Sequence, residues 1–243
     1  MARTSKLTSG ANPTTCRISP EFPMRSHDEH TFIFADMSGF TALTEAHGDE
    51  AAADLVAELA AAVEPRLSRR RAELVKSIGD ALMIRGEDPQ EAIGLGLEIV
   101  HEVGGQDRFP TIRAGLHTGP ATQREDDWFG ATVNLAARVA GRAAGGEVLL
   151  TETTRSALDK GHNLTLRERG RVQLRNVSEP VLLFGAMRRG VVSTQDLPVD
   201  PVCRMAVEPE NAAGSLYHQG TQYHFCSLAC AGRFAAEPER YPG

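Results

Sequence analysis

The sequence predicts an α+β protein with two parts: a larger domain whose sheet is rich in antiparallel strands with helices packed on it, and a small cysteine-containing module. Between residues 27 and 190, short runs of β-branched and aromatic residues alternate with Ala/Leu/Glu-rich stretches of helical periodicity. Three of the four cysteines fall after residue 200. The expected boundaries are a flexible leader at 1–26, the domain at 27–190, a linker at 191–199 and the module at 200–243.

The composition argues against several classes of function and partner. The net charge of −6 argues against nucleic acid or an anionic membrane as partner. No run approaches the ~18 apolar residues of a membrane span, and residues 1–26 lack the apolar core of a signal peptide. These features predict a cytoplasmic protein. Clustered cysteines in such a protein favour metal binding over disulfides.

The stretch from Thr31 to Glu45 predicts a metal and phosphate site. The apolar run Thr31–Ala35 is typical of a buried strand, and it ends at Asp36. A glycine-containing turn follows, and then a helix with Thr41 or Thr44 as its expected N-cap. Asp36 could hold a divalent cation, and the N–H groups of the turn could hold phosphate oxygens. The alternative is an Asp36 that only caps an ordinary strand-to-helix connection.

A second carboxylate occupies a similar position in the next predicted hairpin. Residues 72–85 are expected to form two strands with Asp80 at the turn, and an Asp80 opposite Asp36 could share cations with it. A helix is expected before this hairpin at 43–71, kinked or broken at Pro65 and ending in a solvated arginine run. A second helix is expected at 88–103, with Asp88 as its N-cap.

The remaining elements of the larger domain supply two more candidate residues. Asn134 and Arg138 lie four positions apart, so they share one face of a predicted helix. His117 ends a predicted strand and is interpreted as a structural histidine. The expected elements are a strand at 111–117, a polar loop at 121–129, the helix at 131–143, a strand at 147–151, a short helix at 153–159 and two or three antiparallel strands within 164–188.

Four segments in fixed order, FADMSGFTALTE, VKSIGDALM, RAGLHTG and DWFGATVNLAAR, resemble the class III nucleotide cyclase domain. The resemblance covers about residues 31–188 and implies a ferredoxin-like fold. It implies two Mg²⁺ or Mn²⁺ ions per active site and a head-to-tail homodimer in which each site takes residues from both chains. It also implies roles for individual residues: Asp36, Met37 and Asp80 for metal, Ser38, Gly39, Phe40, Thr41, Arg113, Lys76 and Asp127 for substrate, and Asn134 and Arg138 for catalysis.

The pair matched to purine recognition favours ATP. Lys76 offers a donor and Asp127 an acceptor, which complement the N1 acceptor and the amino donor of adenine, whereas guanine presents the reverse pattern. Each mismatched buried polar group costs ~1–3 kcal/mol, so two mismatches give roughly 2–6 kcal/mol in favour of ATP. The resemblance therefore implies an adenylate cyclase. The alternatives are a weak or silent cyclase-like domain with metal sensing as its main role, and a guanylyl cyclase, which Lys76 and Asp127 oppose.

Residues 200–241 resemble the YHS domain, a small module related to those of heavy-metal handling proteins. DPVC-x-M, YHFCS and Cys230 carry the resemblance. Cys203, Cys226 and Cys230 suit Zn²⁺ or Cu⁺, with His218, His224, water or nothing as fourth ligand. The alternative is three reduced, partly buried cysteines. A further hypothesis is that metal here modulates the cyclase across the linker at 190–198.

Overall fold

The structure is a computed structural model, and it describes residues 29–107, 109–188 and 197–241. The predicted leader at 1–26 and residues 191–196 of the predicted linker lie outside the described residues. None of the described helices combines the length and the apolar character that a membrane-spanning helix requires.

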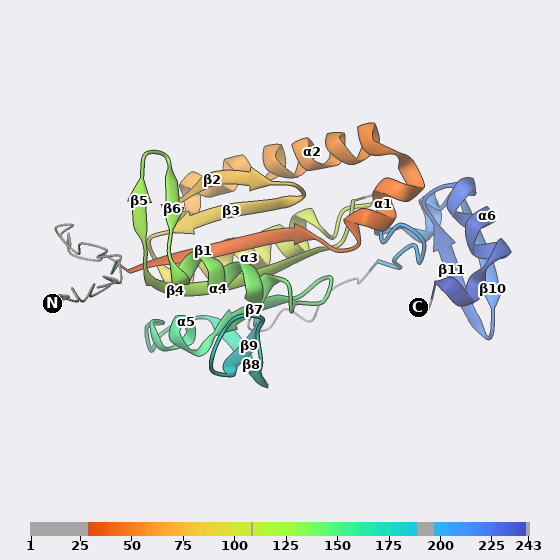
Figure 1. Ribbon diagram of the computed structural model, residues 1–243. Helices are drawn as coiled ribbons and strands as arrows, with labels where there is room; N and C mark the ends of the chain where they lie inside the picture. The colour runs from red at the N-terminus through yellow and green to blue at the C-terminus, as the bar shows by residue number, and fades with distance from the viewer. Residues whose placement is uncertain (1–28, 108, 189–196, 242–243) are drawn as a thin grey trace, which may run out of the picture.

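The larger part of the chain is built on one seven-stranded sheet with the order β2-β3-β1-β4-β7-β9-β8 (Figure 1). Neighbouring strands run antiparallel except for the parallel pair β4 and β7. This mostly antiparallel sheet confirms the predicted α+β class. The strands span Glu29–Met37 (β1), Ala72–Ile78 (β2), Ala81–Gly86 (β3), Ile112–Pro120 (β4), Val148–Thr151 (β7), Leu164–Val172 (β8) and Val181–Arg188 (β9).

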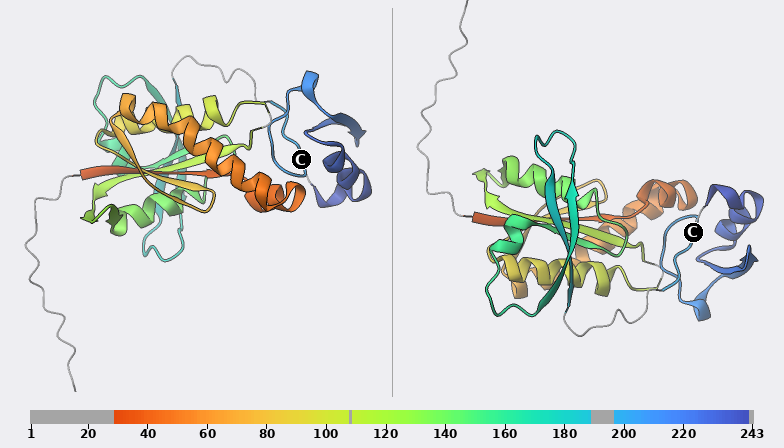
Figure 2. Two further views of the ribbon diagram at one scale, coloured as in Figure 1. Left: turned by 90° about the horizontal axis from the view of Figure 1, so that it is seen from above. Right: turned by 90° about the horizontal axis from the view of Figure 1, so that it is seen from below.

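Helices cover both faces of this sheet (Figure 2). Ile33 and Ala35 of β1 belong to the core formed with α2 and α3, whereas Phe32 and Phe34 pack with α4. Because side chains alternate along a strand, the Asp36 side chain leaves β1 on the α4 face. The helices of this part are α1 (Phe40–His47), α2 (Asp49–Leu67), α3 (Pro89–Glu98), α4 (Ala131–Ala140) and α5 (Glu152–Ser156).

A glycine on the central strand β4 lets α4 lie close to the sheet. A Cβ added at Gly115 would come within 1.9 Å of the backbone nitrogen of Ala140. No larger residue fits at this position without moving the helix away from β4. Gly115 therefore sets the height at which α4 holds Asn134 and Arg138 over the sheet.

The predicted helix at 43–71 is wrong in its extent and in its point of interruption. The structure has two helices, and they meet at Gly48, whose φ of 89° no helix accommodates. Pro65 lies in the last turn of α2, and the helix continues past it to Leu67. The expected caps Thr41 and Thr44 are also wrong, because the N-cap position of α1 is Gly39 and the Thr44 hydroxyl donates to the Phe40 carbonyl at 2.9 Å.

One further prediction needs correction, and others are confirmed. The expected polar loop at 121–129 is a short hairpin of β5 (Thr122–Arg124) and β6 (Asp127–Phe129). The region 164–188, where two or three antiparallel strands are expected, holds two, which agrees with that prediction. The hairpin at 72–85 is confirmed, and so is Asp88 as the cap of α3, since its carboxylate accepts from the Glu91 N–H at 2.9 Å.

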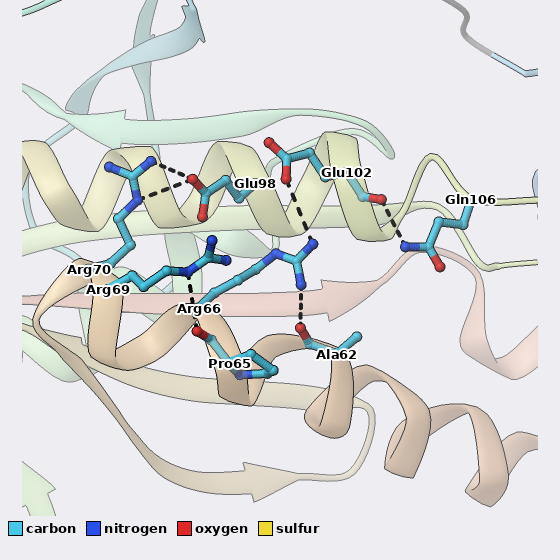
Figure 3. A network of polar contacts seen from close by, with 8 residues as sticks. All are labelled: Ala62, Pro65, Arg66, Arg69, Arg70, Glu98, Glu102 and Gln106. Atoms are coloured by element: carbon cyan, nitrogen blue, oxygen red, sulfur yellow. Dashed lines mark hydrogen bonds and ion pairs between the residues drawn. The ribbon is translucent and has the colours of Figure 1, made fainter.

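The arginine run after α2 is not a solvated helix end throughout. Arg70 crosses to α3, where its Nη1 lies 2.8 Å from Glu91. Its guanidinium also pairs with Glu98, as Figure 3 shows. The Arg70 side chain is 28% exposed, so these ion pairs are partly screened from water. Arg70 thus fastens the end of α2 to α3 on the sheet face opposite α4.

The C-terminal module packs against the end of the sheet next to α1 (Figures 1 and 2). The hydrophobic core of the module includes residues of the larger domain. Leu43 of α1 and Ala52 of α2 belong to the same cluster as Phe225 and Phe234. A bridge between Pro110 and Met205 adds backbone pairing between the two parts. The module contains β10 (Gly214–His218), β11 (Thr221–Phe225) and α6 (Leu228–Ala236).

Candidate functional site

The two predicted metal carboxylates lie side by side at one end of the sheet. Asp36 pairs with Ala81 across β1 and β3, which places Asp80, the preceding residue, next to Asp36. On the other side, Asp36 is paired in register with Arg113 of β4, whose Nε and Nη2 donate to one Asp36 oxygen at 2.9 and 2.5 Å. The strand pairing therefore brings two carboxylates and one guanidinium together.

The Asp80 carboxyl group lies in surroundings that disfavour its ionised form. Burial, then a side-chain hydrogen bond to Asp36 and its negative charge, raise the pKa of Asp80 to about 6. Arg113 opposes this shift only in part. A divalent cation would relieve the repulsion between the two carboxylates, and oxygen ligands of this kind suit Mg²⁺ or Mn²⁺. The donor set thus fits the predicted ions.

The turn after Asp36 has the shape expected of an anion-binding connection. Gly39 adopts a left-handed φ of 80° and leads directly into α1. The first N–H groups of a helix have no partner within it, so those of Phe40 and Thr41 remain for a ligand. The Ser38 N–H is already used, since it donates to the Thr111 carbonyl at 2.8 Å. Sequence alone gave no sign of this Thr111 contact.

The predicted purine pair forms a contact within one chain. Lys76 Nζ lies 2.5 Å from an Asp127 oxygen and 5.9 Å from the centre of the Phe129 ring. The hydrogen bond from Lys76 lowers the pKa of the Asp127 carboxyl, which stays ionised. The other Asp127 oxygen accepts from the Trp128 N–H at 2.8 Å. The β5–β6 hairpin, expected as a loop, thus presents Asp127 to β2.

Asn134 and Arg138 lie on α4, as predicted, whereas Asp36 lies on β1 and Asp80 between β2 and β3. Asn134 is exposed and Arg138 is half-buried. Arg138 borders a hollow that it shares with Arg142, Gln173 and Arg175. Among the described residues, no hydrogen bond or ion pair joins Asn134 or Arg138 to Asp36, Asp80 or Arg113. One chain therefore displays the predicted residues as separate groups.

His117 is a structural residue, in line with its interpretation from sequence. Its Nδ1 lies 2.8 Å from the Thr151 hydroxyl of β7, and burial lowers its pKa to about 4. A histidine whose pKa falls on folding binds its proton more weakly in the folded state, so stability is lost as pH falls from about 6.5 towards 4.

Thermal unfolding checks this property of His117. We expect the wild type to lose up to about 1.4 kcal/mol of stability per pH unit more than His117→Gln across that window. The variant keeps a polar side chain without the titrating ring. Parallel losses in both proteins would contradict the assignment.

The three cysteines of the C-terminal module gather around a histidine from the larger domain. Cys203 and Cys226 sulfurs are 3.4 Å apart, and Cys226 and Cys230 sulfurs are 3.8 Å apart. His47, the last residue of α1, places its Nε2 3.5 Å from Cys226 Sγ and 3.9 Å from Cys230 Sγ. All four ligand atoms lie within 4.8 Å of one another. Sequence reasoning missed His47, which stands 179 positions from Cys226.

The pKa values of the clustered thiols are shifted in opposite directions. Contacts with the thiols of Cys203 and Cys226 lower the pKa of Cys230, whereas contacts with Cys226 and Cys230 raise that of Cys203. Cys230 lies in the first turn of α6, where its N–H donates to Ser227. These contacts favour the thiolate form at Cys230 over that at Cys203, and the thiolate is the form in which a cysteine binds a soft cation.

A buried carboxylate fixes the two cysteine loops relative to each other. Asp200 is fully buried and accepts from the N–H groups of Val202 and Cys226 at 2.8 and 2.9 Å. Burial raises the pKa of Asp200. The carboxylate holds the backbone beside Cys203 and Cys226 in place, as outer partners of metal ligands do.

Comparison with known proteins agrees with this geometry. Residues 22–186 match the family described as the adenylate and guanylate cyclase catalytic domain, and residues 199–243 match the YHS domain. A pH-sensitive adenylate cyclase of Mycobacterium tuberculosis is 35% identical over 175 residues, which cover 71% of this chain and 44% of that protein. An adenylate cyclase of Streptomyces griseus is 32% identical over 117 residues, which cover 48% of this chain and 29% of that protein.

Solved structures share the fold. An adenylate cyclase structure from Trypanosoma brucei, studied in its monomeric state, matches with a TM-score of 0.61 at 26% identity and covers 76% of this chain and 97% of that one. The adenylyl cyclase CyaB from P. aeruginosa matches with a TM-score of 0.58 at 23% identity, covering 69% and 97%. The chain spans less than half the length of the two curated relatives, but the family match covers most of the chain itself. This chain belongs to the adenylate and guanylate cyclase catalytic domain family.

Proposed function

We propose that the protein is an adenylate cyclase that converts ATP to 3′,5′-cyclic AMP and pyrophosphate at the interface of a homodimer. The observation that carries the proposal is the side-by-side arrangement of Asp36 and Asp80 at the turn that opens α1. Carboxylates for divalent cations and N–H groups for phosphate oxygens are what a nucleoside triphosphate requires. The relatives named adenylate cyclase support the same reaction.

In this proposal, different residues of the chain bind the metal ions, the phosphates and the ribose. Asp36 and Asp80, with the Met37 backbone, would hold two Mg²⁺ or Mn²⁺ ions, which when bound lower the pKa of the ribose 3′-hydroxyl and neutralise the triphosphate. Gly39, Phe40 and Thr41 hold phosphate oxygens through the turn, and Ser38 contributes its side chain. Arg113 turns from Asp36 to the phosphates. Asn134 positions the ribose, and the planar Arg138 guanidinium stabilises charge on the transferring phosphoryl group.

Lys76 and Asp127 select adenine in this proposal. Their mutual ion pair keeps the ammonium and the carboxylate oriented before the base arrives. Lys76 then donates to N1 of adenine, and Asp127 accepts from the amino group. Guanine would leave both groups facing like partners, which disfavours it.

The dimer explains why the residues occupy separate parts of one chain. Two copies placed head to tail would bring Asp36 and Asp80 of one copy to Asn134 and Arg138 of the other. Exposed apolar side chains near the Lys76–Asp127 pair support such an interface: Ile78 is 47% exposed and Phe129 is 51% exposed.

Turnover of ATP and GTP by the purified full chain in Mn²⁺ tests the proposal. We expect cyclic AMP from ATP and much less cyclic GMP from GTP. Product from GTP in preference to ATP would contradict the adenine assignment. No product from either nucleotide, in a protein that sedimentation shows to be dimeric, would contradict the enzyme.

A silent cyclase-like domain with metal sensing as its main role is the second candidate. The observation that favours it is that both carboxylates already have partners: Asp36 accepts hydrogen bonds from Arg113, and Asp127 accepts one from Lys76. In that case nucleotide would bind without turnover. The hypothesis that the C-terminal metal modulates the cyclase belongs with the first candidate alone, since it requires turnover that the metal can change.

A further inference from the structure

The cysteine cluster is completed by the larger domain rather than by the module that carries the cysteines. Neither His218 nor His224, the histidines within the module, belongs to the cluster among the described residues. His218 packs edge-on against Phe234 instead. His47 supplies the nitrogen, and it comes from the end of α1.

Four of the six distances among the ligand atoms are close to those of a tetrahedral site, and all six are within 4.8 Å. Two sulfurs on one zinc ion at about 2.3 Å lie about 3.8 Å apart, and a sulfur and a histidine nitrogen lie about 3.5 Å apart. The sulfur–sulfur distances here are 3.4 and 3.8 Å, and the nitrogen–sulfur distances are 3.5 and 3.9 Å. The three cysteines are buried and the histidine is half-buried, as in a closed structural site.

We propose that His47, Cys203, Cys226 and Cys230 form one four-ligand zinc site that joins the two domains, so that occupancy of the site fixes α1. A site of three cysteines alone would fasten only the loops of the small module. With His47 as fourth ligand, the same ion ties that module to the helix that follows the Asp36 turn. His47 is a metal ligand, and its role is structural coupling rather than catalysis.

The other end of α1 is already in contact with the module. A Cβ at Gly39 would lie 2.6 Å from Cγ of Arg204, the residue after the ligand Cys203. The Arg204 carbonyl accepts from the Thr111 N–H at 3.3 Å, and the Thr111 carbonyl accepts from Ser38 at 2.8 Å. The turn at Ser38–Gly39 thus touches the loop of Cys203, while α1 runs from that turn to His47.

Through these contacts, a metal bound at the cluster would be connected to both ends of α1 and to the turn at Ser38–Gly39. A second fastening point strengthens this connection, because Arg233 of α6 donates to the Glu45 carbonyl near the end of α1 at 3.0 Å. The linker named in the sequence hypothesis is not needed for such coupling. Occupancy of the site should therefore lower the local opening of α1 and of the turn before it.

Metal titration of the full chain tests the site without any assay of cyclase activity. Zn²⁺ is added under reducing conditions in excess Mg²⁺, so that carboxylate sites are filled, and Co²⁺ serves as a spectroscopic probe. We expect one tight site with the absorption of tetrahedral, thiolate-bound Co²⁺. His47→Ala should weaken Zn²⁺ binding by about 100-fold or more, since even changes to outer partners cost 10–100-fold.

Two variants make the result specific. His218→Ala removes a histidine of the module that carries the cysteines, and this variant should bind Zn²⁺ like the wild type. His47→Cys restores a fourth ligand and should recover tight binding with a Co²⁺ spectrum shifted towards four thiolates. A loss of affinity in His218→Ala, or an unchanged affinity and spectrum in His47→Ala, would overturn the proposal. A wild type that binds no Zn²⁺ would overturn it as well.

Hydrogen exchange tests the coupling to α1. Amides of Phe40–His47 should exchange more slowly in the zinc-loaded wild type than in the metal-free protein, and zinc should have no such effect in His47→Ala. Equal protection of α1 with and without zinc would contradict the coupling. Neither outcome depends on turnover, so a failed cyclase assay and a failed metal site are told apart.

Discussion

Replacing Asp36 with alanine should abolish cyclic AMP formation, with a loss of at least ~10²-fold in kcat, the scale expected when one contact made to the transition state is removed. The physical reason is that, in the proposed mechanism, Asp36 and Asp80 together provide the negative charge that holds the divalent cations. Removing one carboxylate leaves Arg113 without its partner, which adds positive charge where a cation must bind. The measurement is turnover of ATP in Mn²⁺.

Two controls separate loss of chemistry from loss of fold. Asp36→Asn keeps the shape of the side chain and an acceptor for Arg113, and it should be as inactive as the alanine variant. Asp54→Ala removes an exposed carboxylate on α2 and should retain full activity. An Asp36→Asn protein with the wild-type melting temperature and wild-type turnover would contradict the role given to this carboxylate.

Exchanging the partners of the Lys76–Asp127 pair should change which nucleotide is used. The double variant Lys76→Glu, Asp127→Lys retains an ion pair between β2 and β6 but swaps donor and acceptor. We expect the ratio of kcat/KM for ATP to that for GTP to fall by about 30-fold or more, the lower end of the cost of two mismatched polar groups.

The single variants serve as controls for this exchange. Lys76→Ala and Asp127→Ala each remove one partner, so each should shrink the ATP preference by less than the double variant does. Measuring KM and kcat separately shows whether the pair acts in base binding. An unchanged ATP preference in the double variant, with turnover retained, would contradict the proposed adenine contacts.

The positions that sequence predicts well are those where the chemistry and the local structure coincide. Asp36 lies near the end of one apolar strand and Asp80 lies in the turn between two others, so the sequence could offer them as neighbours, and the pairing of β1 with β3 places them side by side. Asp88 was recognisable as a cap because a proline follows it. In these cases neighbouring residues alone determine the local structure.

Other features depend on contacts that no local pattern reveals. The strands β5 and β6 have only three residues each, too few to show a periodic pattern, and the turn between them uses Glu125 at a φ of 53° instead of a glycine. The break between α1 and α2 lies at a single Gly48 in an otherwise helix-favouring stretch. His47 joins the cysteines only because α1 packs on the C-terminal module, and nothing around His47 indicates a metal ligand.

Mixing two inactive variants tests the central claim, a catalytic site shared between two copies, most directly. Asp36→Ala lacks a carboxylate proposed to hold metal, and Arg138→Ala lacks the arginine proposed to stabilise the transition state. A heterodimer of the two contains one damaged and one intact site, so an equal mixture should regain about one quarter of the wild-type activity. Each variant alone should stay inactive. An inactive mixture, in which affinity tags show that heterodimers have formed, would contradict the shared site.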